Sequence, residues 1–505
     1  MITLHEAAAI RQAEHDHPDE LASGVLMARA AHGVAASVID LLTQARGGIV
    51  GARIVVLAGA GSNGGDALHA GAILARRGAF VVAIAATATP HAGGLSALLD
   101  AHGRCIPWDD AESAAQLAAA DLVLDGLLGI GASGALREPI ASIVHATHGL
   151  DALVVAVDLP TGVDADTGVV EGDAVDADLT VTFAGLKPGL VTMPGKARAG
   201  GVRIIDIGIN DVLADCGGVL EEADIADLVP EPLMTDHKYR RGVVGICAGS
   251  PQYPGAALLS ASAACAADIG MVEYLDRGDA LASRVVDRHP TVVATTGDPS
   301  ANTRVSAWVV GPGFSGTPAD RDAIGVLLRC NVPVVLDAGA LTAIAHDEQL
   351  RQAVRARTSP TVMTPHDGEF ARLSDVPVGQ GRIAAARALA ADLRVTVVLK
   401  GAGTVIAAPD GTLLVDMLGS PALSTAGSGD VLAGLLGALL ASAQARAAAS
   451  LDHPEVARVA AAACWIHGAA GRLAATGARP VTASDLAGAL PSAIAHVRRP
   501  GGLPS

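Results

Sequence analysis

Short runs of apolar, β-branched residues alternate along the whole chain with longer stretches rich in alanine and leucine. The runs have the length of strands buried on both faces, and the stretches between them can form helices that cover a sheet. The pattern therefore predicts an α/β fold with parallel sheets. Strands are expected in the first half at 54–57, 80–85, 122–124, 153–157, 179–183 and 202–205, and in the second half at 243–247, 291–293, 307–310, 332–336, 361–363 and 396–399.

This alternation breaks between residues 210 and 236, where acidic residues and prolines replace it. A basic run at 237–241 then precedes the second series of strands. Each half is long enough for its own core, and the two halves carry different glycine-rich segments, which indicates fusion rather than duplication. We predict a first domain over residues 1–215, a linker over 216–235 and a second domain over 236–505.

The composition excludes several classes of protein. Half of the 505 residues are apolar, so the chain is not disordered, and only 2% are aromatic, so aliphatic side chains must fill the core. There are 35 lysines and arginines against 52 aspartates and glutamates, a net charge of −17. An acidic surface with few rings for base stacking argues against a nucleic-acid partner.

The mean hydropathy of +0.42 is high for a soluble protein. The apolar stretch at 431–443 is nevertheless shorter than the ~20 residues of a spanning helix, and the N-terminal segment is not typical of a secretory signal. We expect a cytoplasmic protein with no membrane partner. The six cysteines form no C-x-x-C pair, so neither a disulfide framework nor a zinc site is indicated.

A glycine-rich loop follows the first predicted strand of the first half, with the sequence Gly-Ala-Gly-Ser-Asn-Gly-Gly-Asp at 59–66. It contains the G-x-G-x-x-G pattern that lets backbone N–H groups approach a pyrophosphate. The acidic residue that dehydrogenases place at the end of the next strand is missing, because that strand ends Ala-Ala-Thr at 85–87. Asn63 and Asp66 instead put an amide and a carboxylate in the loop, which suits polar or cation contacts.

Two further predicted strands end in carboxylates, Asp125 and Asp158. Ligands of parallel α/β sheets bind at the carboxyl ends of the strands. A single acid there could merely cap a helix or hold a turn. Polar groups at three strand ends favour a ligand site.

These motifs resemble the N-terminal domain of the NAD(P)H-hydrate repair enzymes, the NAD(P)HX epimerase, over roughly residues 1–215. The early segment 26–30, Leu-Met-Ala-Arg-Ala, is part of the resemblance. It implies a Rossmann-like domain that interconverts the R and S epimers of hydrated NADH or NADPH. Carried over by position, Asp158 is the acid/base residue, potassium binds Asn63, Asp125 and Thr161, and the dinucleotide contacts Ser62, Asn63, Gly64, Gly65, Asp66, Gly129, Ile130, Gly131, Ala132, Ser133, Gly134, Ala135 and Asp158. Ser62 and Ala67 depart from the family's loop, which usually reads Asn-Asn-Gly-Gly-Asp-Gly.

The second half has no G-x-x-x-x-G-K-[ST] loop. Its strongest signal is Ala-Gly-Ser-Gly-Asp at 426–430, directly before the apolar helical stretch 431–443. Small residues at a helix start leave backbone N–H groups free to stabilise a transferred phosphoryl group, and Asp430 can accept a proton from an attacking hydroxyl. Alternatively, Asp430 is only a favourable first-turn acid. Further polar or flexible segments follow other strands, at 249–256, 311–313, 336–338, 364–370 and 400–404.

This set resembles the ribokinase-like superfamily over roughly residues 236–500, and within it the ADP/ATP-dependent NAD(P)H-hydrate dehydratases. The resemblance implies dinucleotide contacts from Ala256, Gly313, His366 and Asp430, and adenine-nucleotide contacts from Lys400, Gly401, Ala402, Gly403, Thr404 and Gly429. From the residues alone, His366 could be a structural histidine and Glu369 a helix-start acid. The chain departs from the family's usual residues at Gly339, Ser420, Ala422, Leu423, Ser424 and Ala426.

Together the two resemblances imply a bifunctional enzyme that repairs NADHX and NADPHX. One domain epimerises the C6 carbinol, and the other phosphorylates and eliminates the C6 hydroxyl at the expense of ADP or ATP. Potassium is implied in the first domain and Mg²⁺ in the second, and a homo-oligomer is expected. Two alternatives stay open: a small-molecule kinase in the second half, and a non-catalytic dinucleotide-binding module in the first.

Overall fold

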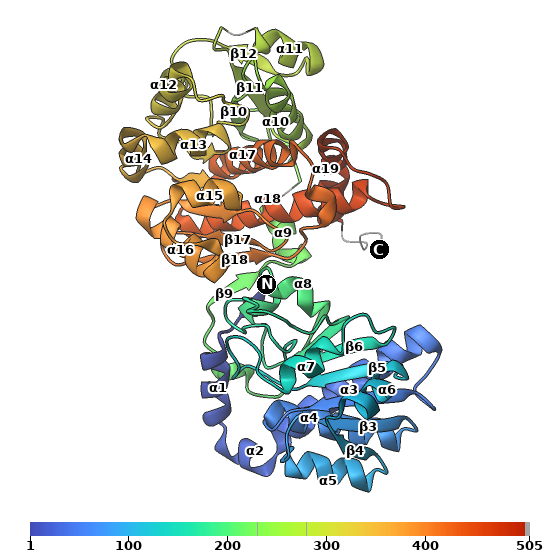
Figure 1. The fold of residues 1–505 in the computed structure, drawn as a ribbon. Coiled ribbons are helices and arrows are strands. Elements are labelled where there is room, and N and C mark those ends of the chain that lie inside the picture. Colours follow the sequence, from blue (N-terminus) through green and yellow to red (C-terminus); the bar gives the residue numbers. More distant parts are fainter. Residues whose placement is uncertain (230, 279, 500–505) are drawn as a thin grey trace. The chain divides into compact units, whose positions relative to one another are not determined.

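The computed structural model describes residues 1–229, 231–278 and 280–499, and it divides the chain into two compact units (Figure 1). The N-terminal unit holds residues 3–216, and the C-terminal unit holds the chain from Gly217 onward together with Met1 and Ile2. The segment expected to be a linker contains β9 (Gly217–Val219) and α9 (Glu222–Leu228). Because Leu220, Ile225 and Val229 are buried in the core of the C-terminal unit, most of that segment is part of this unit.

The N-terminal unit is built on a seven-stranded sheet in which every pairing is parallel, in the order β4-β3-β2-β5-β6-β7-β8. Chain order reverses between β2 and β5, which is where ligands bind in Rossmann-like sheets. The expected α/β, Rossmann-like fold is confirmed. The strands are β2 (Arg53–Ala58), β3 (Phe80–Ala85), β4 (Arg104–Pro107), β5 (Leu122–Gly126), β6 (Leu153–Val157), β7 (Leu179–Phe183) and β8 (Gly201–Ile205).

Both faces of this sheet are buried, which explains the continuous apolar runs. In β2, Ile54 and Val56 pack in one core, with α3 (Val25–Arg46) and α4 (Ser62–Arg76), while Val55 and Leu57 pack in the other. Side chains alternate across a strand, so each run must be apolar throughout. The remaining helices are α1 (Ala7–His15), α2 (Pro18–Ser23), α5 (Ala92–Asp100), α6 (Asp110–Ala118), α7 (Ile140–His145) and α8 (Gly195–Ala199).

The C-terminal unit is built on a sheet with the strand order β9-β18-β17-β16-β15-β14-β13-β10-β11-β12, and Ile2, the first residue of the short strand β1, belongs to the same unit. The pairings from β16 to β12 are parallel, and β17 is antiparallel to both of its neighbours. The strands not yet given are β1 (Ile2–Leu4), β10 (Val243–Cys247), β11 (Met271–Leu275), β12 (Val293–Thr295), β13 (Ala307–Val310), β14 (Val334–Leu336), β15 (Thr361–Met363), β16 (Thr396–Leu399), β17 (Thr404–Ala407) and β18 (Leu413–Asp416).

A large core joins one face of this sheet to the helices α10 (Pro254–Ala266), α17 (Ser428–Arg446), α18 (His453–Ala474) and α19 (Ala483–Arg498). It consists mostly of alanine, valine and leucine, as the scarcity of aromatic residues predicts. The other helices of the unit are α11 (Leu281–Arg288), α12 (Pro318–Leu327), α13 (Gly339–His346), α14 (Glu348–Arg355), α15 (Asp367–Leu373) and α16 (Arg382–Leu393).

Two helices, α3 and α17, are long and apolar enough to cross a membrane by length and composition alone. The helix α17 extends beyond the apolar run 431–443 at both ends. The length expected from the sequence was therefore too short. Its most apolar window is 67% buried inside the protein, and that of α3 is 44% buried. Both helices contribute to the cores, which accounts for their apolar composition.

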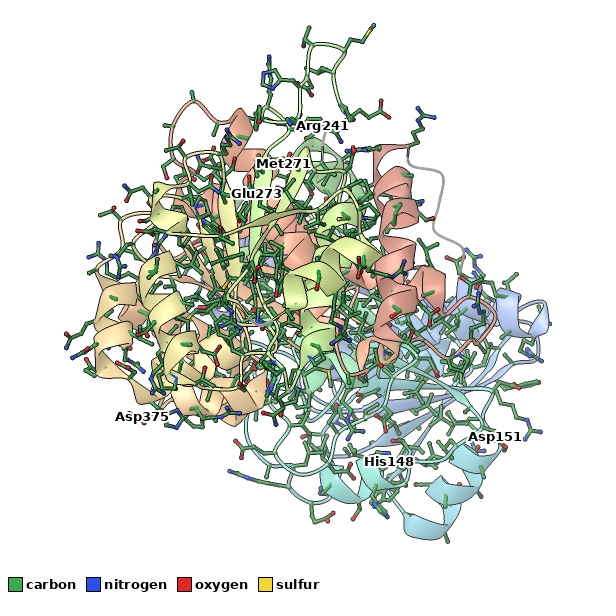
Figure 2. The ribbon with its side chains drawn as sticks, turned by 90° about the horizontal axis from the view of Figure 1, so that it is seen from above. His148, Asp151, Arg241, Met271, Glu273 and Asp375 are labelled. Carbon is green, nitrogen blue, oxygen red and sulfur yellow. The ribbon has the colours of Figure 1, made fainter. Side chains whose placement is uncertain are left out.

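The sequence pattern missed β11 because a charged residue interrupts it. Glu273 lies in the middle of this strand (Figure 2) and is buried. Its Oε2 accepts a hydrogen bond of 2.6 Å from Asn302 Nδ2. A buried carboxylate is tolerated in a strand when a partner satisfies it, and this partner comes from a distant part of the chain.

Candidate active sites

The glycine loop of the N-terminal unit joins the end of β2 to the start of α4. A Cβ atom on Gly59 would lie 2.0 Å from the carbonyl oxygen of Leu127, and one on Gly64 would lie 2.2 Å from that of Gly59. These two glycines are therefore required by contacts within the protein, independently of any ligand. The methyl group of Ala67, the residue that departs from the family's loop, faces Gly126. A Cβ atom on Gly126 would lie 2.3 Å from this methyl group, so the alanine is accommodated because residue 126 has no side chain.

The three residues expected to bind potassium lie in one hydrogen-bonded group. Thr161 donates to both carboxylate oxygens of Asp125, through Oγ1 (2.7 Å) and the backbone N–H (2.8 Å). Asn63 Nδ2 donates to the carbonyl of Leu128 (2.9 Å), whose own N–H donates to Thr161 Oγ1 (3.2 Å). The three side chains therefore lie together at one edge of the sheet, as the positions of Asn63 and Asp125 after neighbouring strands predict.

The oxygen atoms of this group suit a hard cation. Asn63 Oδ1 is buried and has no hydrogen-bond partner among the described residues. Burial raises the pKa of Asp125 to about 6, although its hydrogen bonds from Thr161 and Leu127 act in the opposite direction. An unpaired amide oxygen and a carboxylate with no ion pair among the described residues fit a potassium ion.

Asp158 follows β6 with a left-handed backbone, φ = +67°. Its Oδ1 lies 2.6 Å from the Nζ of Lys187, and the Thr182 hydroxyl donates to the same oxygen (3.1 Å). Lys187 is only 1% exposed and also donates to Thr182 Oγ1 and the carbonyl of Phe183, both at 2.8 Å. Sequence reasoning missed this lysine, although a lysine inside the apolar segment 184–191 is itself a signal.

Asp66 supplies a second carboxyl group of different character. It is 8% exposed, and its Oδ1 has no hydrogen-bond partner in the described part of the chain. Burial, followed by the charges of Asp158 and Glu14, raises the pKa of Asp66 well above its usual value. The site therefore contains one carboxylate paired with a lysine and one carboxyl group whose protonated form is favoured by burial.

The other dinucleotide residues expected in this unit lie on two segments beside that site. Ser62 and Gly65 are in the first turn of α4, and the segment 129–135 forms a partly exposed turn after β5. Gly134 in that turn has φ = +79°. Both segments follow strands that meet at the point where chain order reverses. This geometry does not show which of these residues contact a ligand. Their roles in binding the dinucleotide therefore stay predictions.

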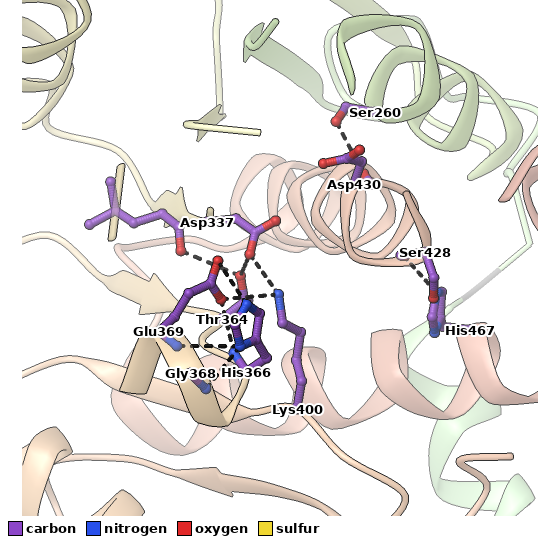
Figure 3. Close-up of polar contacts among 11 residues, drawn as sticks. Ser260, Asp337, Thr364, His366, Gly368, Glu369, Lys400, Ser428, Asp430 and His467 are labelled. Carbon is purple, nitrogen blue, oxygen red and sulfur yellow. Dashed lines mark hydrogen bonds and ion pairs between the residues drawn. The ribbon is translucent and has the colours of Figure 1, made fainter. Parts of the chain in front are cut away.

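In the C-terminal unit, side chains from the ends of three adjacent strands meet close to the start of α17 (Figure 3). Lys400 Nζ lies 2.8 Å from Asp337 Oδ1 and 3.8 Å from Glu369 Oε2. Thr364 Oγ1 donates to the same Asp337 oxygen (2.7 Å). A Cβ on Gly429 would lie 3.3 Å from Lys400 Nζ, so the ammonium group stands against the first turn of the helix.

Asp430 lies in that first turn, after Gly427 with φ = +87°. Burial and then the charge of Asp337 raise the pKa of Asp430 to about 7, while Lys400 acts against the shift. Burial lowers the pKa of Lys400, but the negative charges of Asp337 and Glu369 outweigh this effect, so the pKa of the lysine is raised. A carboxyl group that titrates near neutral pH, beside a permanent positive charge and a helix N-terminus, can remove a proton where negative charge develops.

His366 and Glu369 cap the helix α15 reciprocally. The Nδ1 of His366 accepts from the N–H groups of Gly368 (3.0 Å) and Glu369 (3.3 Å), and Glu369 Oε2 accepts from the N–H of His366 (2.9 Å). Both residues thus have the structural roles that the sequence left open. The His366 side chain is still 56% exposed. A dinucleotide contact from it stays a prediction.

The remaining expected contacts form two groups. Ala256 and Gly313 are neighbours, since a Cβ on Gly313 would lie 2.6 Å from the Cβ of Ala256. The segment 400–404 turns from β16 into β17, and Thr404 is the first residue of β17. Arg382, which the sequence did not single out, holds this turn by donating to the carbonyl of Lys400 (2.7 Å) while pairing with Asp367 (2.8 Å).

One departure from the dehydratase pattern has a steric explanation. A Cβ on Gly339 would lie 2.6 Å from both the Cβ and the carbonyl oxygen of Phe314. The aspartate usual in the family at this position therefore does not fit the present backbone. Nothing in the structure explains the residues at 422–424.

The two units thus have the architecture of a two-domain α/β enzyme, with one Rossmann-like domain and one domain whose site resembles that of a kinase. The family described as NAD(P)H-hydrate dehydratase matches residues 244–492, and the family described as YjeF-related protein N-terminus matches residues 23–189.

Curated relatives carry both domains. The bifunctional NAD(P)H-hydrate repair enzyme Nnr of Mycobacterium tuberculosis H37Rv is 44% identical, over 86% of this chain and 88% of that protein. The enzyme of the same name from Corynebacterium glutamicum is 35% identical, over 88% of this chain and 89% of its own length. The chain therefore belongs to the family of bifunctional NAD(P)H-hydrate repair enzymes.

A solved structure aligns with the C-terminal part. It is the ADP/ATP-dependent NAD(P)H-hydrate dehydratase of Bacillus subtilis, co-crystallised with ATP/Mg²⁺. It is 28% identical, with a TM-score of 0.47, and the match covers 56% of this chain and all of that one.

The pair of Lys187 with Asp158 generates a stability prediction. We expect Lys187→Met to lower the free energy of unfolding of the N-terminal unit by about 3–5 kcal/mol, because it leaves a buried carboxylate without its partner. The matched control is Arg104→Met, at an exposed ion pair with Glu112, which should cost about 0–1 kcal/mol. Urea denaturation measures both, and equal losses would contradict a buried, energetically coupled pair.

Proposed function

We propose that the N-terminal unit epimerises hydrated NADH and NADPH, and that the C-terminal unit dehydrates the S epimer with ADP or ATP. Membership in the repair-enzyme family supports both activities. The observation that carries the proposal is Asp430, a partly buried carboxyl group whose pKa is raised to about 7, at a helix N-terminus beside Lys400. This is the arrangement that phosphoryl transfer from a nucleotide to a hydroxyl group requires.

In the N-terminal unit the dinucleotide lies against the first turn of α4 and the segment 129–135. Asp158 takes the proton of the C6 hydroxyl as the C6–N1 bond breaks, which leaves a carbonyl group at C6 and the electron pair on N1. N1 then re-forms the bond from the opposite face of that carbonyl and Asp158 returns the proton to its oxygen, so that the configuration at C6 is exchanged. Lys187 and Thr182 fix the orientation of this carboxylate through its Oδ1. Asn63, Asp125 and Thr161 would hold a potassium ion, which would supply positive charge to the site when bound.

In the C-terminal unit Asp430 takes the proton of the C6 hydroxyl, whose oxygen attacks the terminal phosphorus of ADP or ATP. That phosphorus–oxygen bond forms as the bond to the leaving AMP or ADP breaks. The C6–oxygen bond then breaks with loss of a proton from the neighbouring carbon, which releases phosphate and restores the dihydronicotinamide ring. The N–H groups of the first turn of α17 and the ammonium of Lys400 face the charge that develops on the phosphoryl oxygens.

A Mg²⁺ ion accompanies the nucleotide in this proposal, as in the description of the Bacillus subtilis structure. Within the described residues, no group of three or more His, Cys, Asp or Glu side chains could hold a metal ion. The nucleotide phosphates and water are therefore its main ligands, which is usual for Mg²⁺. We further propose that the protein is a cytoplasmic homo-oligomer.

The decisive experiment supplies a mixture of R and S NADHX with K⁺, Mg²⁺ and either ADP or ATP. We expect loss of both epimers with stoichiometric AMP or ADP. Asp430→Asn should abolish this loss while nucleotide binding and epimer exchange persist, and Asp158→Asn should leave the R epimer unconsumed. Chromatography of both epimers, with NADH absorbance, measures each step.

Asp485→Asn is the matched control, because Asp485 is also a first-turn acid but belongs to α19. If it impaired turnover as strongly as Asp430→Asn, the role of Asp430 would be that of a helix-start acid. A stable phosphorylated product would identify a small-molecule kinase, and loss of the S epimer alone would identify a non-catalytic first unit.

The raised pKa of Asp430 predicts how the rate of dehydration depends on pH. The base must be ionised, so kcat/KM for dehydration should rise about tenfold per pH unit below a pH of about 7 and level off above it. Lys400 stays protonated over this range because its pKa is raised. Initial rates between about pH 5.5 and 8.5 test this, and a flat profile would exclude Asp430 as the essential base.

The potassium site gives a prediction that needs no turnover. Potassium should raise the melting temperature of the N-terminal unit relative to lithium at equal ionic strength, because a ligand that binds only the folded state stabilises it. Asn63→Ala should remove the difference, whereas Asn331→Ala, at an exposed site in the other unit, should keep it. The same potassium effect in Asn63→Ala would place the ion elsewhere.

A further inference from the structure

Two buried side chains reach across from neighbouring helices to carbonyl groups in the first turn of α17. His467 Nε2, from α18, lies 3.0 Å from the carbonyl oxygen of Ser428 and 3.4 Å from its hydroxyl. Ser260 Oγ, from α10, donates to the carbonyl of Asp430 (3.1 Å). Figure 3 shows both contacts, on residues that flank the proposed phosphoryl site.

The protonation of His467 follows from its partner. A carbonyl oxygen can only accept, so Nε2 must carry the proton. Complete burial lowers the pKa of His467 to about 4, and the hydrogen bond to Ser428 counteracts only part of this. The ring is therefore a neutral donor at neutral pH.

These bonds are additional to those of the helix itself. Within α17 the carbonyls of Ser428 and Asp430 can accept from the N–H groups four residues later, so neither needs a side-chain donor to be satisfied. Ser262, on the same helix as Ser260, shows the common alternative, since its hydroxyl donates back to the carbonyl of Leu258 in its own helix (2.6 Å). Ser260 instead crosses to α17.

The two helices approach closely enough to fix this contact. A Cβ on Gly434 would lie 2.2 Å from the carbonyl oxygen of Ser260, so the backbones of α10 and α17 are in direct contact there. The first turn of α17 is thus held from α10 on one side and from α18 on the other. A first turn held in this way keeps its free N–H groups and the Asp430 carboxylate in a fixed direction.

We propose that His467 and Ser260 are positioning residues for phosphoryl transfer, which orient the first turn of α17 without touching substrate. This inference rests on the dehydratase activity proposed above. Displacements of about 1 Å at a reacting group can cost about 100-fold in rate, so loss of one bond should affect catalysis more than binding.

The test compares His467→Leu, which removes the donor at similar volume, with His467→Gln, whose side-chain N–H can replace Nε2–H. We expect His467→Leu to lower kcat for dehydration by about 10–100-fold with KM for ADP and NADHX changed less than about threefold. His467→Gln should recover most of the loss. Ser260→Ala should lower kcat in the same way. Ser262→Ala removes a bond within α10 and a contact with His289, neither of which involves α17, and should leave kcat unchanged.

A second measurement is independent of turnover. Amide hydrogen exchange of peptides covering residues 425–434 should accelerate in His467→Leu and Ser260→Ala, and return towards the wild-type rate in His467→Gln. Equal losses in the Leu and Gln variants, or a loss of kcat in proportion to a lowered melting temperature, would overturn the inference. An inactive wild-type enzyme with the expected exchange pattern would instead contradict the proposed dehydratase function alone.

Discussion

A lysine paired with a buried carboxylate at the end of a parallel strand organises each of the two sites. Lys187 pairs with Asp158 in the N-terminal unit, and Lys400 pairs with Asp337 in the C-terminal unit. A buried carboxylate is tolerated only with a partner, so each pair fixes the relative positions of the segments that carry it. Because parallel strands end at the same edge, these pairs can join residues distant in sequence.

The two pairs differ in whether the lysine contacts the proposed reactive carboxyl group. In the N-terminal unit the lysine contacts the proposed acid/base residue itself. In the C-terminal unit Lys400 contacts Asp337, and Asp430 stands beside the pair with a raised pKa. One site thus orients its reactive carboxylate directly, whereas the other adjusts the proton affinity of a carboxyl group that the lysine does not bind.

The sequence predicted features that depend on local pattern. Buried strands such as β6 and β13 were found with their correct bounds, because both of their faces are apolar, and the acids that follow strands marked both sites. The contributions of Glu273, Lys187 and His467 could not be predicted in this way, because each depends on a partner far away in the sequence. The antiparallel pair β17–β18 was also missed, because these strands follow the glycine-rich segment 400–404 without the helix that separates the parallel strands.

The close contact of α17 with α10 restricts how the C-terminal unit can respond to a nucleotide. Gly434 leaves no space between the two backbones, and Gly437 similarly admits no side chain beside Val309 of the sheet. A helix held along its length in this way resists both sliding and rotation about its axis. A change in the position of α17 would therefore have to carry α10 and the adjoining part of the sheet with it, so the first turn of α17 is fixed relative to both.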